Sequence, residues 1–309
     1  MLLSEFDFHL PPESIAQTPP AERGASRMLV LHRAEGRWED RSFADLPSYL
    51  GPGDCLVLND SRVIPARLHG RRTGHTGHVE ALLVRPESGD ALTWLALMRP
   101  GRKLRTGDVI EFGEGFHATI QCEGGFWQRL DQYGHIPLPP YIHRPDTAAD
   151  RERYQTVFAA ARGSVAAPTA GLHFTPALLD ACARSGAATA RVTLHVGLGT
   201  FQPLHVSNIE DVKLHAERFH VPPEAAAGIE QATRVIPIGT TAMRTIESHA
   251  LGLSGETSLF ISPGFRFQRA GALLTNFHLP QSSLLVLVCA FAGRELTLEA
   301  YRHAIRSGY

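Results

Sequence analysis

The sequence lacks most of the short patterns that identify common enzyme chemistries. It has no GxSxG elbow, no GxxxxGK[ST] phosphate loop, no GxGxxG after a predicted strand and no HExxH pair. Its cysteines are more than fifty residues apart, which excludes a CxxC pair and suggests no disulfide framework. Its sixteen histidines are scattered, so no metal site is expected. The four cysteines are Cys55, Cys122, Cys182 and Cys289.

Long apolar runs and an excess of positive charge are also missing. The most apolar run, residues 282–293, is too short to cross a bilayer, and the first residues lack a secretion-signal pattern. Thirty Lys and Arg residues nearly balance 31 Asp and Glu residues, so any RNA contact would come from a local patch. We therefore expect a soluble, cytoplasmic chain of 309 residues that does not enter a membrane.

The segment 165–204 is the strongest candidate for a ligand site. Thr175 suits a helix N-cap, and Gly186 suits the left-handed end of the same helix. An apolar strand, 190–196, then runs into a glycine loop, and strand-end loops with small hydroxyl residues commonly bind ligands. The candidate residues of this segment are Thr169, Gly171, His173, His195, Gly197, Gly199 and Thr200.

Other predicted strands also end in polar turns. One buried strand ends near residue 60, and another is followed by a Gly-Thr-Thr turn and a helix, where free N–H groups suit an anion or a ribose. A third loop precedes an apolar helix capped near Ser282. Threonine also caps helices that bind nothing, so this signal alone is weak. The residues singled out are Asn59, Arg62, Thr240, Thr241, Asn276 and His278.

Residues 65–134 have a different texture. Short alternating strands, including one at 126–131, are separated by glycine turns with no helix between them. We predict a layered α/β domain (1–64 and 135–309) with an inserted small antiparallel β-barrel domain (65–134). The insert is locally basic and carries Trp94 and Trp127, which suits RNA binding and base stacking as well as it suits a solvated barrel rim.

One carboxylate and one histidine are spaced for proton transfer. His215 and Glu217 would share a face if their segment is extended. From the residues alone, the prediction is an α/β enzyme with a Gly-, Thr- and His-rich site and a nucleoside- or nucleotide-containing substrate.

Seven longer blocks resemble one enzyme family. They are NDSRVIPARLHG (59–70), HIPLPPYI (135–142), YQTVFA (154–159), SVAAPTAGLHF (164–174), VTLHVGLGTFQP (192–203), GTTAMRTIES (239–248) and TNFHLPQSSLLVLVCAFAG (275–293). Together, and in this order, they resemble the S-adenosylmethionine:tRNA ribosyltransferase-isomerases of queuosine biosynthesis. Two departures are Val212, where the family usually has histidine, and the end at Tyr309, where relatives typically continue with an aromatic stretch.

The resemblance implies a reaction and its partners. The ribosyl unit of S-adenosylmethionine would move onto 7-aminomethyl-7-deazaguanine at the wobble position of a tRNA anticodon loop, giving epoxyqueuosine-tRNA, adenine and methionine. S-adenosylmethionine would be consumed as a substrate with no separate cofactor and no metal, and a monomer is expected. The alternatives are an S-adenosylmethionine-dependent RNA methyltransferase, which would need a glycine-rich loop after an early strand, and a non-catalytic tRNA-binding module.

The implied chemistry assigns hypothetical roles to these residues. C5′ protons beside a sulfonium are acidified, so a positioned base could begin the reaction by removing one. The acid/base candidates are His173, His215 with Glu217, and His278. The candidates for ribose and methionine binding are Gly197, Gly199, Thr200, Thr240 and Thr241, with Asn59, Thr169, Gly171, His195 and Asn276 as further substrate-binding candidates. Arg62, Arg67 and Arg244 would meet phosphate or carboxylate.

Overall fold

The structure is a computed structural model that describes residues 1–309 except 88–92, 101–103, 105–106, 115, 118–125 and 198–203. The described strands are β1 (Arg27–His32), β2 (Arg37–Ser42), β3 (Asp54–Asn59), β4 (Ser61–Val63), β5 (Arg67–Arg72), β6 (His78–Pro86), β7 (Trp94–Arg99), β8 (Ile110–Gly113), β9 (Phe116–His117), β10 (Ala161–Ser164), β11 (Ala188–Leu194), β12 (Glu217–His220), β13 (Arg234–Ile238) and β14 (Gly255–Thr257). The described α-helices are α1 (Phe126–Tyr133), α2 (Asp150–Arg153), α3 (Pro176–Arg184), α4 (Pro223–Gln231), α5 (Thr240–Ala250), α6 (Ser283–Ala292) and α7 (Arg294–Arg306). Short 3₁₀ helices cover Leu3–Phe6, Pro12–Ser14, Phe43–Tyr49, Thr169–His173 and Ile209–Asp211.

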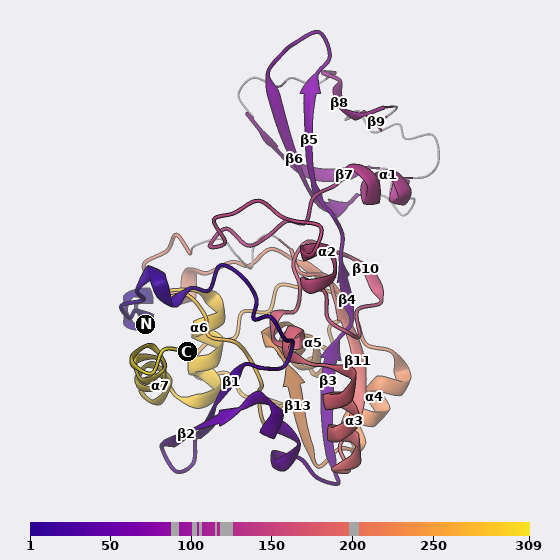
Figure 1. The fold of residues 1–309 in the computed structure, drawn as a ribbon. Helices are drawn as coiled ribbons and strands as arrows, with labels where there is room; N and C mark the ends of the chain where they lie inside the picture. The colour runs from indigo at the N-terminus through magenta and orange to yellow at the C-terminus, as the bar shows by residue number, and fades with distance from the viewer. Residues whose placement is uncertain (88–92, 101–103, 105–106, 115, 118–125, 198–203) are drawn as a thin grey trace.

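A five-stranded sheet in the order β13-β3-β11-β12-β14 forms the centre of the body (Figure 1). The strands β13, β3 and β11 are parallel, whereas β12 and β14 are antiparallel to their neighbours. The central strand β3 is buried along its whole length, as its continuous apolar sequence predicts for a strand covered on both faces. Cys55 and Val57 pack with α4 and α5, while Leu56 and Leu58 pack with α3 and the Phe43–Tyr49 helix.

The strand directions bring polar segments together at one edge of this sheet. The parallel strands β3, β11 and β13 all end there, and their carboxyl ends meet at a common edge. Leu194 at the end of β11 pairs with Phe219 of the antiparallel β12. The first residue of β12, Glu217, therefore lies beside the loop that follows β11. Polar groups from distant parts of the chain meet at this edge.

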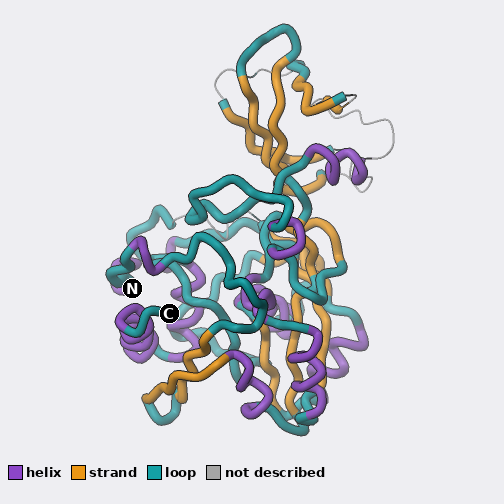
Figure 2. Tube along the Cα trace, in the orientation of Figure 1, coloured by secondary structure: helices purple, strands orange, loops and turns teal. Residues whose placement is uncertain are grey.

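The inserted segment forms a second sheet, which projects from the body (Figure 1) and consists mainly of strands (Figure 2). Its strands are antiparallel in the order β7-β6-β5-β8-β9, around a core that includes Trp94, Ile110, Phe112 and Leu130. Within the described residues β7 and β9 do not pair, so the sheet is not seen to close into the expected barrel. The expectation of no helix was wrong, because residues 126–131, taken as a strand, belong to α1.

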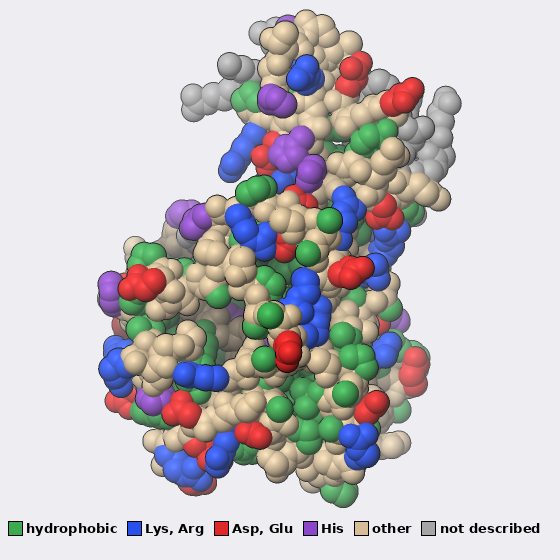
Figure 3. Space-filling view, viewed as in Figure 1, with side chains coloured by type: hydrophobic (Ala, Val, Ile, Leu, Met, Phe, Trp, Pro, Cys, Tyr) green, Lys and Arg blue, Asp and Glu red, His purple; other side chains and the backbone are tan. Residues whose placement is uncertain are grey.

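The end of the chain packs against its beginning. The helices α6 and α7 share a core with Phe6 and Phe8, and the Ser282 side chain caps α6 as the sequence predicts. Although α6 is strongly apolar, no helix among the described residues is long and apolar enough to span a bilayer. On the face in Figure 3, basic and acidic side chains are interspersed, in keeping with the balanced composition.

Candidate functional site

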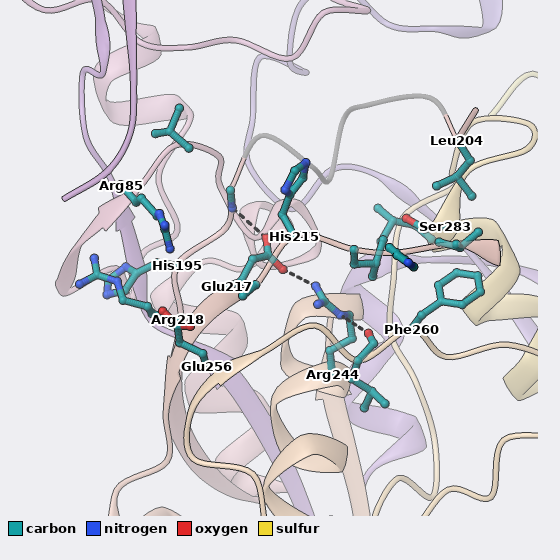
Figure 4. Close-up of a pocket in the computed structure, with 18 of the residues that line it drawn as sticks. Arg85, His195, Leu204, His215, Glu217, Arg218, Arg244, Glu256, Phe260 and Ser283 are labelled. Carbon is teal, nitrogen blue, oxygen red and sulfur yellow. Dashed lines mark hydrogen bonds and ion pairs between the residues drawn. The ribbon is translucent and has the colours of Figure 1, made fainter. Parts of the chain in front are cut away.

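A cavity of about 610 Å³ lies between the edge of the central sheet and the outer surface of β6 and β7. The body contributes His195, Gly197, His215, Glu217 and Arg244 to its lining (Figure 4). All five were predicted as site residues, although they come from the loop after β11, the approach to β12 and the helix α5. The cavity is of the size that small-molecule sites commonly have.

Two buried charged side chains that line the cavity, Glu217 and Arg244, form an ion pair. The two side chains are only about 7% and 5% exposed. Glu217 Oε2 pairs with Arg244 Nη1, and Glu217 Oε1 accepts the Gly197 N–H at 2.8 Å. Arg244 Nε donates to the Leu259 carbonyl at 3.0 Å, but its buried Nη2 has no hydrogen-bond partner among the described residues. One donor of this cavity-lining guanidinium is therefore buried and unused.

Two histidines approach this ion pair with different degrees of burial. The side chain of His215 is exposed, whereas that of His195 is half-buried and its Nδ1 is buried without a partner. Burial lowers the pKa of His195, and the nearby Arg218 charge lowers it further, so its imidazole is neutral at pH 7. Gly163 leaves room for this ring, because a Cβ there would lie 3.1 Å from the His195 Nδ1.

His173 and His278 are not among the residues that line this cavity. His173 Nδ1 lies 3.0 Å from Ser26 Oγ, and its Nε2 lies 2.9 Å from Asn276 Oδ1. Burial lowers the pKa of His173, which favours the neutral ring. His278 Nε2 lies 3.0 Å from Thr275 Oγ1, and burial lowers the pKa of His278 to about 4. The structure therefore separates these two predicted histidines from the cavity pair.

Several predicted ligand contacts make internal bonds instead. The Asn59 side chain donates to the Leu194 carbonyl and to Thr241 Oγ1, and it accepts from the Leu194 and Ser61 N–H groups. It thereby joins β3, β11 and α5, and Thr240 is buried at the start of α5. Gly171 is needed for close packing, because a Cβ there would lie 2.7 Å from both Thr156 and Phe158.

The remaining predicted residues lie outside the cavity lining or outside the described part of the chain. Thr169 begins a 3₁₀ helix away from the cavity lining. Arg62 is exposed on β4, and Arg67 on β5 lies 3.7 Å from Glu80 with a buried Nε that has no partner among the described residues. Gly199 and Thr200 lie outside the described residues. Within the described part of the chain, no group of three or more His, Cys, Asp or Glu could hold a metal ion.

The sequence analysis missed the contribution of the insert to the cavity. Leu95 and Leu97 line it and are 46% and 52% exposed, whereas Trp94 is 7% exposed and lies in the core of the insert. Of the alternatives left open for the basic, Trp-containing insert, base stacking by Trp94 is not supported, because side chains alternate across a strand and this one points into the core of the insert. Because both faces of β7 are apolar, the sequence alone did not show which face packs into the core of the insert.

Comparison with known proteins identifies the family. The family model described as "Queuosine biosynthesis protein" matches residues 3–309, and the chain belongs to this family. An S-adenosylmethionine:tRNA ribosyltransferase-isomerase from Solibacter usitatus is 56% identical, over 100% of this chain and 97% of that protein. The enzyme of the same name from Moorella thermoacetica is 49% identical, over 100% of this chain and 96% of the relative.

The fold is also similar to a solved structure. The crystal structure of an S-adenosylmethionine tRNA ribosyltransferase from Thermotoga maritima has 35% sequence identity and a TM-score of 0.56 to this chain. The match covers 99% of this chain and 96% of the other. The mixed α/β body and the antiparallel sheet both fall within this span.

Proposed function

We propose that the protein transfers and isomerises the ribosyl unit of S-adenosylmethionine onto 7-aminomethyl-7-deazaguanine at the wobble position of tRNA, producing epoxyqueuosine-tRNA with adenine and methionine. The observation that carries this proposal is the full-length identity of 56% to a ribosyltransferase-isomerase. The cavity supports it, since it combines an anion-binding donor with groups suited to proton transfer.

S-adenosylmethionine would bind with its carboxylate towards Arg244. The unused Nη2 of Arg244 is a charged donor in a buried setting, where a bond to a carboxylate is strong. Glu217 holds the guanidinium in place through its Oε2 and the Gly197 backbone through its Oε1. Its negative charge also favours the positively charged sulfonium in the same cavity.

The proton transfers belong to groups that line the cavity. We assign His215 the removal of a C5′ proton, because its exposed imidazole lines the cavity close to Glu217 in sequence and in space. The neutral His195 would contact the nucleoside through the ring edge that does not face Gly163. His173 and His278 act as positioning residues that hold the loops bearing Asn276 and Thr275.

The wider setting follows from the same proposal. Residues 1–64 and 135–309 would form the catalytic domain, and residues 65–134 a barrel-like domain that meets the anticodon loop. S-adenosylmethionine would be consumed as a substrate with no further cofactor, by a monomer in the cytoplasm. Arg62 and Arg67, where the two parts join, would contact the RNA backbone.

The direct test is a product analysis. The protein is incubated with S-adenosylmethionine and tRNA bearing 7-aminomethyl-7-deazaguanine, and the nucleosides are examined by mass spectrometry. Epoxyqueuosine with an equal amount of free adenine is the expected result. A methylated base would support a methyltransferase instead, and bound but unmodified tRNA would support a binding module.

A further inference from the structure

The strand β7 of the insert has two apolar faces. Trp94, Ala96 and Met98 pack into the core of the insert, while Leu95 and Leu97 point outward and are 46% and 52% exposed. An antiparallel sheet with one face in its core usually presents polar residues on the other. Exposed leucines on a projecting sheet therefore indicate a surface that is covered during function.

The outward face of β7 forms one wall of the cavity. Leu95 and Leu97 line it together with Val84 and Arg85 of the neighbouring strand β6. Arg85 lies opposite Leu95 across the β6–β7 ladder. Its ion pair with Glu87 is 3.1 Å long and solvent-exposed, so it contributes little and can be exchanged for another anion.

The opposite wall comes from the body and has a charged and an apolar side. In Figure 4, Arg218 lies on the same side as Arg85, whereas Leu204 and Phe260 lie on the other side, with Glu217 and Arg244 between. Arg85 from the insert and Arg218 from the body thus flank one side of the cavity, together with the carboxylate of Glu256, which lies opposite Arg218 across the β12–β14 ladder. An occupant that enters here meets apolar side chains and at least two cations.

We propose that Leu95, Leu97 and Arg85 form a docking platform for the tRNA base, with the leucines packed on the ring of the wobble base and Arg85 on an adjacent phosphate. This inference rests on the proposed function and names how its RNA substrate is held. Enzymes that act on a base must take it out of the stack, and the unstacked ring then needs a new apolar surface. Flipped bases stack between aromatic or apolar side chains, and cations beside them contact the RNA backbone; Leu95, Leu97 and Arg85 offer both on one face of the insert.

The test is a double-mutant cycle of binding affinities, in which the two leucines and the wobble base are each removed. Wild type and L95S/L97S are titrated with two tRNAs that differ only at the wobble position, one carrying 7-aminomethyl-7-deazaguanine and one abasic. Wild type should prefer the tRNA with the base by about five-fold or more, since packing the base ring against two leucine side chains removes apolar surface from water. L95S/L97S should lose that preference while binding the abasic tRNA as wild type does. Equal preferences in the two proteins, or no preference in wild type, would overturn the platform.

A matched control is available in the same chain. L251S/L253S changes two leucines with the same spacing and with exposed fractions of 50% and 42%, outside the cavity lining. This variant should keep the wild-type preference. Leu97→Trp should keep or increase it, because an aromatic ring can also pack on a base, and this variant separates a lost platform from a misfolded insert.

Two further readouts complete the test. Arg85→Gln should weaken the binding of both tRNAs equally. It should also reduce the steepness of log binding constant against log salt concentration by about one, as loss of a single phosphate contact does. S-adenosylmethionine affinity should be unchanged in L95S/L97S; a five-fold loss there would place the adenine on the leucines and overturn the proposal.

Adenine release by wild type is measured in parallel. If wild type releases none, the proposed function fails; if it does and the leucine effect is absent, only the platform fails.

Discussion

Two pairs of side chains from distant parts of the chain differ in a way that locates the site. Glu217 and Arg244 form a buried charged pair that leaves one arginine donor unused in the cavity wall. His173 and Asn276 form a neutral pair, and both ring nitrogens of His173 have partners. All four residues were predicted individually as site residues, but neither pairing was. The difference teaches that unused hydrogen-bonding capacity in a cavity marks a binding site, whereas satisfied bonds mark the framework around it.

The largest effect is expected from breaking the charged pair. Glu217→Ala leaves the Arg244 charge buried without its carboxylate, which should lower the free energy of unfolding by about 3–5 kcal/mol and abolish adenine release. Urea unfolding and an adenine assay measure the two effects. Glu217→Gln keeps an acceptor for the Gly197 N–H and separates the lost charge from the lost bond.

The control for this pair is an exposed ion pair of the same residue types. Glu230 pairs with Arg269 on the surface, so Glu230→Ala should change stability by at most about 1 kcal/mol and leave turnover unchanged. Similar losses of stability and turnover in Glu230→Ala and Glu217→Ala would show that burial does not distinguish the Glu217–Arg244 pair from the surface pair.

A smaller effect is expected from breaking the neutral pair. His173→Ala removes two hydrogen bonds that contribute about 0.5–1.5 kcal/mol each, so the urea midpoint should fall. Turnover should fall by less than about ten-fold, because a positioning residue acts only through its neighbours. A loss of turnover comparable to Glu217→Ala, with normal stability, would return His173 to the group that touches substrate.

The smallest effect concerns pH. Burial lowers the pKa of His278 to about 4 in the folded state, against about 6.5 when unfolded. As the pH falls, the unfolded state therefore takes up the proton before the folded state does. The contribution of the neutral His278 to the free energy of unfolding is complete above pH 6.5 and is lost as the pH falls towards 4. Unfolding free energies at pH 7 and pH 5 should differ less in His278→Gln than in wild type. An identical pH dependence of the unfolding free energy in both proteins would contradict the lowered pKa of His278.

The local features of the body could be predicted from the sequence. Thr175 and Ser282 accept helix-capping bonds, Gly186 has φ +95°, and His215 and Glu217 line one cavity. Each of these depends on residues near one another in the chain, where backbone preferences and spacing are decisive. The seven long sequence blocks predicted the family, which the family model confirmed.

Features that depend on distant contacts could not be predicted. Arg244 was expected to meet a ligand anion, but its pairing with Glu217 depends on how α5 packs against β12. Leu95 and Leu97 were not singled out, because the packing of the insert decides which face of β7 is exposed, and one position along a strand reverses the face. The helix α1 was taken as a strand, since its short apolar pattern fits either structure.

The most direct measurement is a crystal structure of the protein with S-adenosylhomocysteine, which carries the same carboxylate and nucleoside as the proposed substrate. The account predicts the ligand in the cavity, with its carboxylate within hydrogen-bond distance of Arg244 Nη2 and its nucleoside near His195 and His215. A ligand bound instead against His173 and Asn276, with Arg244 Nη2 still unpartnered, would contradict it.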